Sequence, residues 1–327
     1  MTSYIIRRVL YFIPTLLAIS LVTFFIIQLP PGDFITSFEA RALANGDQAD
    51  LERAAQLRER YGLDQPWYVQ YWRWFTGVLT GDFGYSFQWK QPVSALLGQR
   101  MLLTFLLALA TTVFVWAVAI PMGIFAAMRK NTLGDYAVSF VGFVGLATPD
   151  FLLALVLMWI SFFYFDMSVG GLFSPEFENA PWSLARVWDL LGHLWIPVVV
   201  IGTNGTAGLI RILRANLLDE LHKPYVEAAR SRGLTEWRLT AKYPVRVALN
   251  PFVSGIGDTL PGLISGATIT SIVLSLPTAG PLLLQALLSQ DMYLAGSYIF
   301  LLSILSVLGV LISDILLAWL DPRIRYQ

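Results

Sequence analysis

The stretch VLYFIPTLLAISLVTFFIIQL, residues 9–29, contains no charged side chain from one end to the other. About 20 apolar residues in a row are enough to cross a lipid bilayer as a helix. The hydrocarbon core offers no water to backbone N–H and C=O groups, so a spanning segment must pair them within its own helix. Arg7 and Arg8 precede the stretch, and it is longer than the apolar core of a signal peptide. It therefore predicts a first transmembrane helix that is retained.

The rest of the chain continues this pattern. Of its 327 residues, 56% are hydrophobic and 13% are charged, whereas soluble domains carry about 25% charged residues. Six stretches are long enough to span a bilayer, and they predict an all-α membrane protein with six transmembrane helices. The expected spans are 9–29, 101–128, 136–165, 190–213, 252–276 and 293–320. The fourth and fifth are the least apolar, because they contain Gly, Thr, Asn and Asp.

Lysine and arginine residues predict the orientation of these helices, because they are enriched in short cytoplasmic loops. With both termini in the cytoplasm, fourteen of the 22 basic residues fall in cytoplasmic segments. Most of the others lie between Asp33 and Arg100, in a long segment to which the charge rule applies only weakly. The fourteen are Arg7, Arg8, Arg129, Lys130, Arg211, Arg214, Lys223, Arg230, Arg232, Arg238, Lys242, Arg246, Arg323 and Arg325.

This topology divides the chain into three parts. Residues 1–30 are the N-terminus and first transmembrane helix, residues 31–100 form an external helical insertion, and residues 101–327 are a core with five transmembrane helices. The core contains a cytoplasmic loop, 214–250, between its helices four and five. The insertion is rich in Trp and Tyr. These residues are interpreted either as a capping subdomain with an aromatic belt at the membrane interface or as a docking or sugar-stacking surface.

Several kinds of chemistry are excluded or unsupported. The chain has no cysteine, which excludes disulfides, thiolate catalysis and cysteine-bound metals. Its two histidines, His193 and His222, are not spaced as metal ligands. The sequence contains no G-x-x-x-x-G-K-[ST] phosphate loop and no pairing of nucleophile and base. We therefore expect no catalytic residue, no metal site, no cofactor bound by this chain and no nucleic-acid partner.

The segment KPYVEAARSRG, residues 223–233, predicts a short helix with marked ends in the cytoplasmic loop. Pro224 suits the first helical position, where its missing N–H costs nothing. Gly233 suits the left-handed position that ends a helix. The expected helix has about nine residues and is roughly 13 Å long.

The side chains of this short helix suggest a contact surface. Glu227 lies near the positive end of the helix, Arg230 and Arg232 lie near the negative end, and Glu227 and Arg230 are spaced to pair. Ala228 and Ala229 keep one face thin, so that another protein could approach closely. Composition alone slightly favours the alternative, a basic loop held to anionic lipid.

The pattern Glu227-Ala-Ala-x-x-x-Gly233 resembles the signature of the cytoplasmic coupling loop in permeases of ATP-binding-cassette importers. Nearly the whole chain resembles the oligopeptide, dipeptide and nickel permease family. The matching segments, in order, are YIIRRVL (4–10), IPTL (13–16), LPPGD (29–33), YGLDQP (61–66), QY (70–71), GDFGYS (81–86), PV (92–93), GL (233–234), NP (250–251) and LDPRIRY (320–326).

The resemblance implies a division of labour. This chain would be the first of two homologous permease subunits in the bacterial or archaeal cytoplasmic membrane, with two ATPase subunits beneath it and an external substrate-binding protein. ATP and Mg would be bound by the ATPase subunits. The coupling helix would dock in a groove of one ATPase and pass its motion into helices four and five. Its expected contact residues are Pro224, Tyr225, Glu227, Ala228, Ala229, Arg230, Arg232 and Gly233.

The sequence departs from the family pattern at three places. Ser271 stands where the family often has Glu, and Leu276-Pro277-Thr278 replaces the usual aromatic-Pro-Gly turn. Pro244 is unusual in the coupling region and predicts a break in its second helix.

Polar residues in the expected spans are candidates for the lining of a pathway, because polar groups in lipid are costly unless they face protein or water. For Asp258, an equal alternative is a helix–helix hydrogen bond at a Gly-rich seam. For residues 202–208, an equal alternative is that the small residues allow neighbouring helices to pack closely. Asp150, which follows Pro149 near an expected helix bend, is interpreted as a local cap. The family resemblance adds an external gate at Pro277 and Gly280. The candidate lining residues are Thr203, Asn204, Asp258, Thr268 and Ser271.

The function expected is therefore that of an importer permease that forms the pathway for a small polar solute. Peptide is the first expectation for the solute, oligosaccharide the second, and nickel the third because only two scattered histidines are present. The alternative is a self-sufficient secondary transporter or channel, a class that often shows inverted repeats. No such repeat is evident between the two halves of this chain.

Overall fold

The structure is a computed structural model that describes the chain except for residues 1, 30–31, 33, 166–169 and 321–327, and the side chains of 2–5, 41, 60–61, 258, 260, 263–265 and 320. The expected all-helical class is confirmed, apart from one small two-stranded sheet. The elements are α1 (Thr2–Gln28), α2 (Phe34–Asn45), α3 (Gln48–Tyr61), α4 (Trp67–Leu79), β1 (Tyr85–Ser86), β2 (Gln91–Pro92), α5 (Val93–Met128), α6 (Leu133–Ala147), α7 (Asp150–Phe165), α8 (Leu184–Leu221), α9 (Pro224–Ser231), α10 (Glu236–Lys242), α11 (Pro244–Ala248), α12 (Asn250–Ser254), η1 (Gly255–Asp258), α13 (Thr259–Gly266), α14 (Thr268–Val273), α15 (Ala279–Leu288) and α16 (Met292–Leu320).

The chain divides into two compact units, and each is described by itself. The N-terminal unit comprises Ile6–Leu103 and Thr278–Val307. The core unit comprises Met1–Ile5, Thr104–Pro277 and Leu308–Gln327.

Four helices in the described part of the chain are long and apolar enough to cross a membrane: α1, α5, α8 and α16. The bent pair α6 and α7 makes a fifth if it is counted as one span. Only 11% of the most apolar window of α1 is buried. The outward apolar surface of α1 therefore requires lipid or another protein around it.

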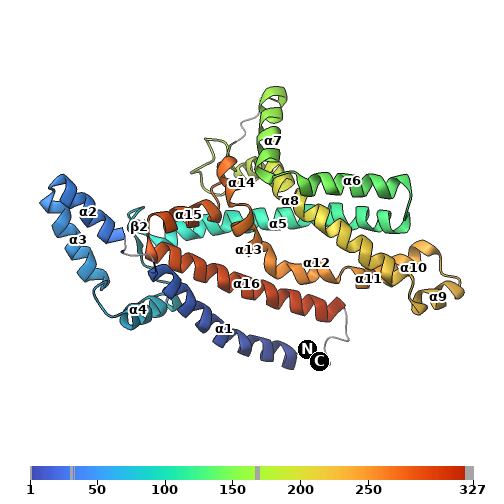
Figure 1. Ribbon diagram of the computed structural model, residues 1–327, viewed down its shortest axis with the longest axis horizontal. Helices are drawn as coiled ribbons and strands as arrows, with labels where there is room; N and C mark the ends of the chain where they lie inside the picture. Colours follow the sequence, from blue (N-terminus) through green and yellow to red (C-terminus); the bar gives the residue numbers. More distant parts are fainter. Residues whose placement is uncertain (1, 30–31, 33, 166–169, 321–327) are drawn as a thin grey trace. The chain divides into compact units, whose positions relative to one another are not determined.

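The expected span 136–165 is not one helix, because the chain turns by 100° between α6 and α7. Figure 1 shows α7 leaving the end of α6 steeply. Thr148, which ends α6, has an extended backbone with ψ of 121°. The ring of Pro149 disfavours helical geometry in the residue before it, and this explains the break.

The expected span 252–276 is also not one helix. It is a run of four short pieces, α12, η1, α13 and α14, because glycines and Pro261 weaken a continuous helix. One glycine is required by packing: a Cβ on Gly257 would lie 2.7 Å from Cγ2 of Val310 and 3.1 Å from its backbone N. The broken segment therefore packs backbone to backbone on the C-terminal part of α16, as small residues allow in membrane proteins.

Aromatic and polar side chains organise the N-terminal unit. Trp74 is buried with Phe24 and Phe300, and its Nε1 donates a hydrogen bond to Oγ of Ser297 at 3.3 Å. In the loop before α16, the fully buried Asp291 accepts a 2.6 Å hydrogen bond from the Ser86 hydroxyl. Trp74, one of the aromatic residues of the segment 31–100, is thus a core residue of this unit.

An ion pair joins α6 to α8 in the core unit, where the two helices lie side by side (Figure 1). Nε and Nη2 of Arg214 each lie 2.7 Å from a different carboxylate oxygen of Asp135. The backbone N–H of Asn131 donates to the same carboxylate at 2.9 Å. The carboxylate of Asp135 is almost fully buried, whereas the Arg214 side chain is 28% exposed. The pair therefore fixes the start of α6 to α8 in a two-pronged geometry.

We expect Arg214→Ala to destabilise the core unit by roughly 3 kcal/mol, because it leaves the buried Asp135 carboxylate without its cation. The measurement is the midpoint of thermal unfolding of the detergent-purified complex. The double variant Asp135→Asn/Arg214→Gln is the control, since it removes both charges and should lose clearly less. Equal losses in the single and double variants would contradict this account of the pair.

Candidate functional site

The short helix expected in the cytoplasmic loop is α9. Pro224 occupies its first turn, and Gly233 follows its end with φ of +79°, as the sequence predicts. The helix contains eight residues, one fewer than expected. The predicted break at Pro244 is also confirmed, because α10 ends at Lys242 and α11 begins at the proline. Figure 1 shows α9, α10 and α11 following the C-terminal end of α8.

One face of α9 is buried within its own loop. Val226 and Ala229 form a cluster with Leu239 of α10, and Leu234 packs against it. The expectation that Ala228 and Ala229 together form a thin outer face is therefore wrong, because the helix turns Ala229 inward. The exposed residues of the predicted set are Pro224, Tyr225, Glu227, Ala228, Arg230, Arg232 and Gly233.

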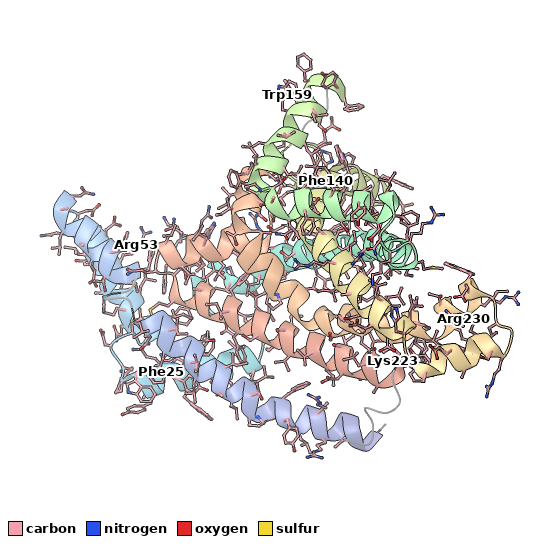
Figure 2. All side chains as sticks on the ribbon, turned by 45° about the vertical axis from the view of Figure 1, so that its right-hand side comes forward. Phe25, Arg53, Phe140, Trp159, Lys223 and Arg230 are labelled. Carbon is pink, nitrogen blue, oxygen red and sulfur yellow. The ribbon has the colours of Figure 1, made fainter. Side chains whose placement is uncertain are left out.

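The expected pair of Glu227 and Arg230 is replaced by another. Nε of Arg230 donates to Oε1 of Glu236 at 2.5 Å. The chain reverses at Gly233, which brings the first residue of α10 back to the last turn of α9. The hydrogen bond from Arg230 lowers the pKa of Glu236. Figure 2 marks Arg230 on this loop, beyond Lys223.

Sequence reasoning missed the residue that ties α9 to α8. The buried carboxylate of Glu220, in the last turn of α8, accepts hydrogen bonds at 2.5 Å from Nζ of Lys223 and from the hydroxyl of Tyr225. Burial and the bond to Glu220 raise the pKa of the Tyr225 hydroxyl, which therefore stays a donor. An acidic residue is unfavourable at the negative end of a helix, and this was the available signal for a special role.

A cavity of about 410 Å³ lies in the core unit. It is lined by α5, α7, α8 and the broken segment α12–α13. Its polar lining residues are Thr111, Thr112, Asp150, Asn204 and Thr259, and its larger apolar ones include Val115, Trp116, Ile201, Leu209, Phe252 and Ile256.

The predicted pathway residues are not all brought together. Asn204 lines the cavity, whereas its neighbour Thr203 uses its hydroxyl to donate to the carbonyl of Val199 at 2.6 Å. Thr268 and Ser271 lie on α14 and are not among the lining residues, and Ser271 is buried. The side chain of Asp258 lies outside the described part of the structure.

The two predicted gate residues do not line this cavity either. Pro277 precedes Thr278, and Gly280 lies in the first turn of α15, where it is buried. The role of this segment as a gate stays a prediction.

Four polar lining residues were not predicted as such: Thr111, Thr112, Asp150 and Thr259. Asp150 opens α7 directly after the break, and no capping hydrogen bond to its side chain is found among the described residues. Thr112 donates to the carbonyl of Ala108 at 2.8 Å. The buried hydroxyl of Thr111 has no hydrogen-bond partner among the described residues. Threonines in an apolar helix give little sequence signal, because the same residues can bond to their own backbone.

The described residues contain no group of three or more His, Asp or Glu side chains placed to hold a metal ion. His193 instead makes a 2.8 Å contact from Nδ1 to the carbonyl oxygen of Asp189.

Comparison with known proteins assigns the chain to a family. Residues 119–326 match the family described as "Binding-protein-dependent transport system inner membrane component", and residues 1–108 match the one described as its N-terminal membrane component. The oligopeptide transport system permease protein AppB of Bacillus subtilis is 35% identical over the full length of both chains. The glutathione transport system permease protein GsiC of Salmonella paratyphi A is 33% identical, also over both full lengths. The dipeptide transport system permease protein DppB of Alkalihalophilus pseudofirmus is 28% identical over both full lengths.

These matches cover both halves of the chain and agree with its long apolar helices. The protein is a multi-pass membrane protein, and in its family ATP is hydrolysed by partner ATPases and not by the permease. The chain belongs to the binding-protein-dependent permeases and is a transmembrane permease subunit of an ATP-binding-cassette importer.

Proposed function

We propose that this permease imports short peptides across the cytoplasmic membrane of a bacterium or archaeon. The relatives described above are named for oligopeptide, dipeptide and glutathione transport, which favours peptide over oligosaccharide or nickel. The volume of the cavity, about 410 Å³, lies within the range of roughly 300–1,000 Å³ that is usual for small-molecule sites. The same family match does not favour a self-sufficient secondary transporter.

The working complex contains this chain, a second homologous permease, two ATPase subunits that bind ATP and Mg, and an external binding protein. The chain crosses the bilayer six times with both termini inside, the two broken segments counting as one span each. Residues 31–100 then lie outside as an insertion between residues 1–30 and the core 101–327. The loop 214–250 lies inside, where it meets an ATPase.

The observation that carries the proposal is a continuous connection from the loop to the cavity. The exposed face of α9 receives the movement of the ATPase. The hydrogen bond between Tyr225 and Glu220 passes it to α8. Asn204, which lines the cavity, lies sixteen residues before Glu220 on the same helix, about 24 Å away at the standard helical rise. A rigid displacement of α8 therefore changes the cavity wall.

The proposed substrate class is tested with the complete complex in liposomes. We expect ATP-dependent accumulation of a labelled tripeptide in the presence of the binding protein, and no accumulation of an oligosaccharide of similar mass. A thermal-shift panel of peptides and glycans on the binding protein checks the same point independently. Uptake of the oligosaccharide but not of the peptide would overturn the assignment of peptide as substrate.

We expect Ala228→Trp to reduce ATP-driven uptake at least tenfold, because a large side chain on the exposed face of α9 prevents close docking. Ala228 is exposed, so its replacement tests docking, whereas a large side chain at the buried Ala229 would also disturb folding. Ala55→Trp, at an exposed alanine of α3, is the matched control and should transport normally. Co-purification of the ATPases measures docking directly, and unchanged co-purification and uptake with Ala228→Trp would refute the docking face.

Glu220→Gln should leave the ATPases bound but lower uptake per ATP hydrolysed several-fold. The carboxylate offers one oxygen to Lys223 and the other to Tyr225, whereas in the amide an NH2 group replaces one of these oxygens and faces one of the two donors. Asp219→Asn, the neighbouring exposed acid on α8, removes the same charge and should keep the wild-type ratio. If both variants transport with the same efficiency as the wild type, the connection through Glu220 plays no part in coupling.

A further inference from the structure

We propose that the cavity of the core unit selects for positively charged groups, and that the carboxylate of Asp150 is the side chain that receives them. The ligand class is an organic cation: the terminal ammonium of a peptide, or the charged end of a Lys or Arg side chain. This inference rests on the proposed function for the nature of the solute. The charge of the cavity wall can be measured whether or not the solute is a peptide.

The wall of the cavity carries a negative charge. Asp150 is the only charged residue among the described residues that line the cavity, and none of them is basic. The other polar lining groups are neutral hydroxyls and the amide of Asn204. No hydrogen bond or ion pair to the Asp150 carboxylate is found among the described residues. An acidic group within membrane-spanning structure is costly and usually faces water, a partner or a solute. Here it meets a cavity of about 410 Å³.

The same wall contains a buried hydroxyl, that of Thr111, whose hydrogen-bonding capacity is unused among the described residues. Thr111 is 93% buried, since its exposed fraction is 7%, and its hydroxyl has no partner among the described residues. The adjacent Thr112 shows that a threonine at this point of α5 can bond to its own helix, because its hydroxyl donates to the carbonyl of Ala108. A buried hydroxyl left without a partner costs free energy. A polar solute or ordered water in the cavity would supply that partner.

Aromatic side chains also line the cavity. Trp116 lines the cavity one turn beyond Thr112 and packs edge to face on Phe252, with the ring centroids 6.1 Å apart. The face of an indole ring attracts ammonium and guanidinium groups. The wall therefore combines a carboxylate, an indole and an unpartnered hydroxyl. This set favours cations and disfavours anions, and a low-dielectric surrounding strengthens the preference.

The absence of cysteine from this chain provides a direct test. Asn204→Cys places the chain's single thiol in the cavity, and its reaction rate is measured with a cationic and an anionic methanethiosulfonate reagent. We expect the ratio of cationic to anionic rates to fall about fivefold when Asp150→Asn is added, because the attracting charge is removed. Asp150→Glu should keep the ratio near the starting value. Ala55→Cys, on exposed α3, is the control thiol, whose ratio should not respond to Asp150→Asn.

An unchanged ratio at Asn204→Cys would overturn the proposal, whether or not the complex transports peptides. A second measurement uses two peptides that differ only in lysine or acetyl-lysine at an internal position. We expect Asp150→Asn to lower uptake of the lysine peptide about fivefold relative to the acetylated one. Equal loss for both peptides would also overturn the role of Asp150, while peptide import would stand. A fall in the reagent ratio with no uptake of either peptide by the wild type would support the cation-selective cavity and refute the proposed substrate.

Discussion

Backbone N–H and C=O groups have no partner in the hydrocarbon core of a bilayer, and this constraint decides where the helices of this permease can be interrupted. Irregular backbone at membrane depth is tolerated only inside protein or beside a water-filled cavity. The structure follows this rule. Asp150, directly after the break between α6 and α7, lines the cavity, and so do Gly255, Gly262 and Gly266 of the broken fifth segment. The helix breaks and the cavity are therefore one feature, since the cavity gives water access to backbone groups that lipid could not satisfy.

The long helix α8 connects this cavity to the loop that contains α9. Three polar contacts act on it from different directions: Arg214 pairs with Asp135 of α6, and Glu220 accepts from Lys223 and from Tyr225 of α9. These contacts are buried or half-buried, so solvent screens them less than it screens surface pairs. They resist bending and sliding between α6, α8 and α9. In the proposed coupling, a displacement at α9 moves α6 and α8 with it as a rigid group of helices.

The outer face of α9 and the wall of the cavity have different chemistry. The exposed face carries a tyrosine, an alanine and charged side chains around a buried apolar contact, which suits reversible docking to a partner with a polar rim. The cavity has an apolar wall with one acidic group and several hydroxyls. Such a wall can hold a charged solute briefly without matching each side chain of the solute. An importer whose external binding protein chooses the substrate needs only this weaker discrimination along the pathway.

The sequence by itself determined the features that depend on local physics. Long apolar runs with at most one charged residue predicted α1, α5, α8 and α16. Pro224, Gly233 and Pro244 predicted the limits of the loop helices, because a proline or glycine acts on its own backbone. The sequence indicated a bend near Pro149 but not a turn of 100° between two separate helices. The pieces of the fifth segment were missed, since apolar runs of the same composition fit straight or broken helices. Only the tertiary structure decided that Ala229 faces inward, that Arg230 pairs with Glu236 and that Asp150 lines the cavity with Asn204. Each of these features depends on which segments pack together in space. Residue spacing along one helix does not contain that information.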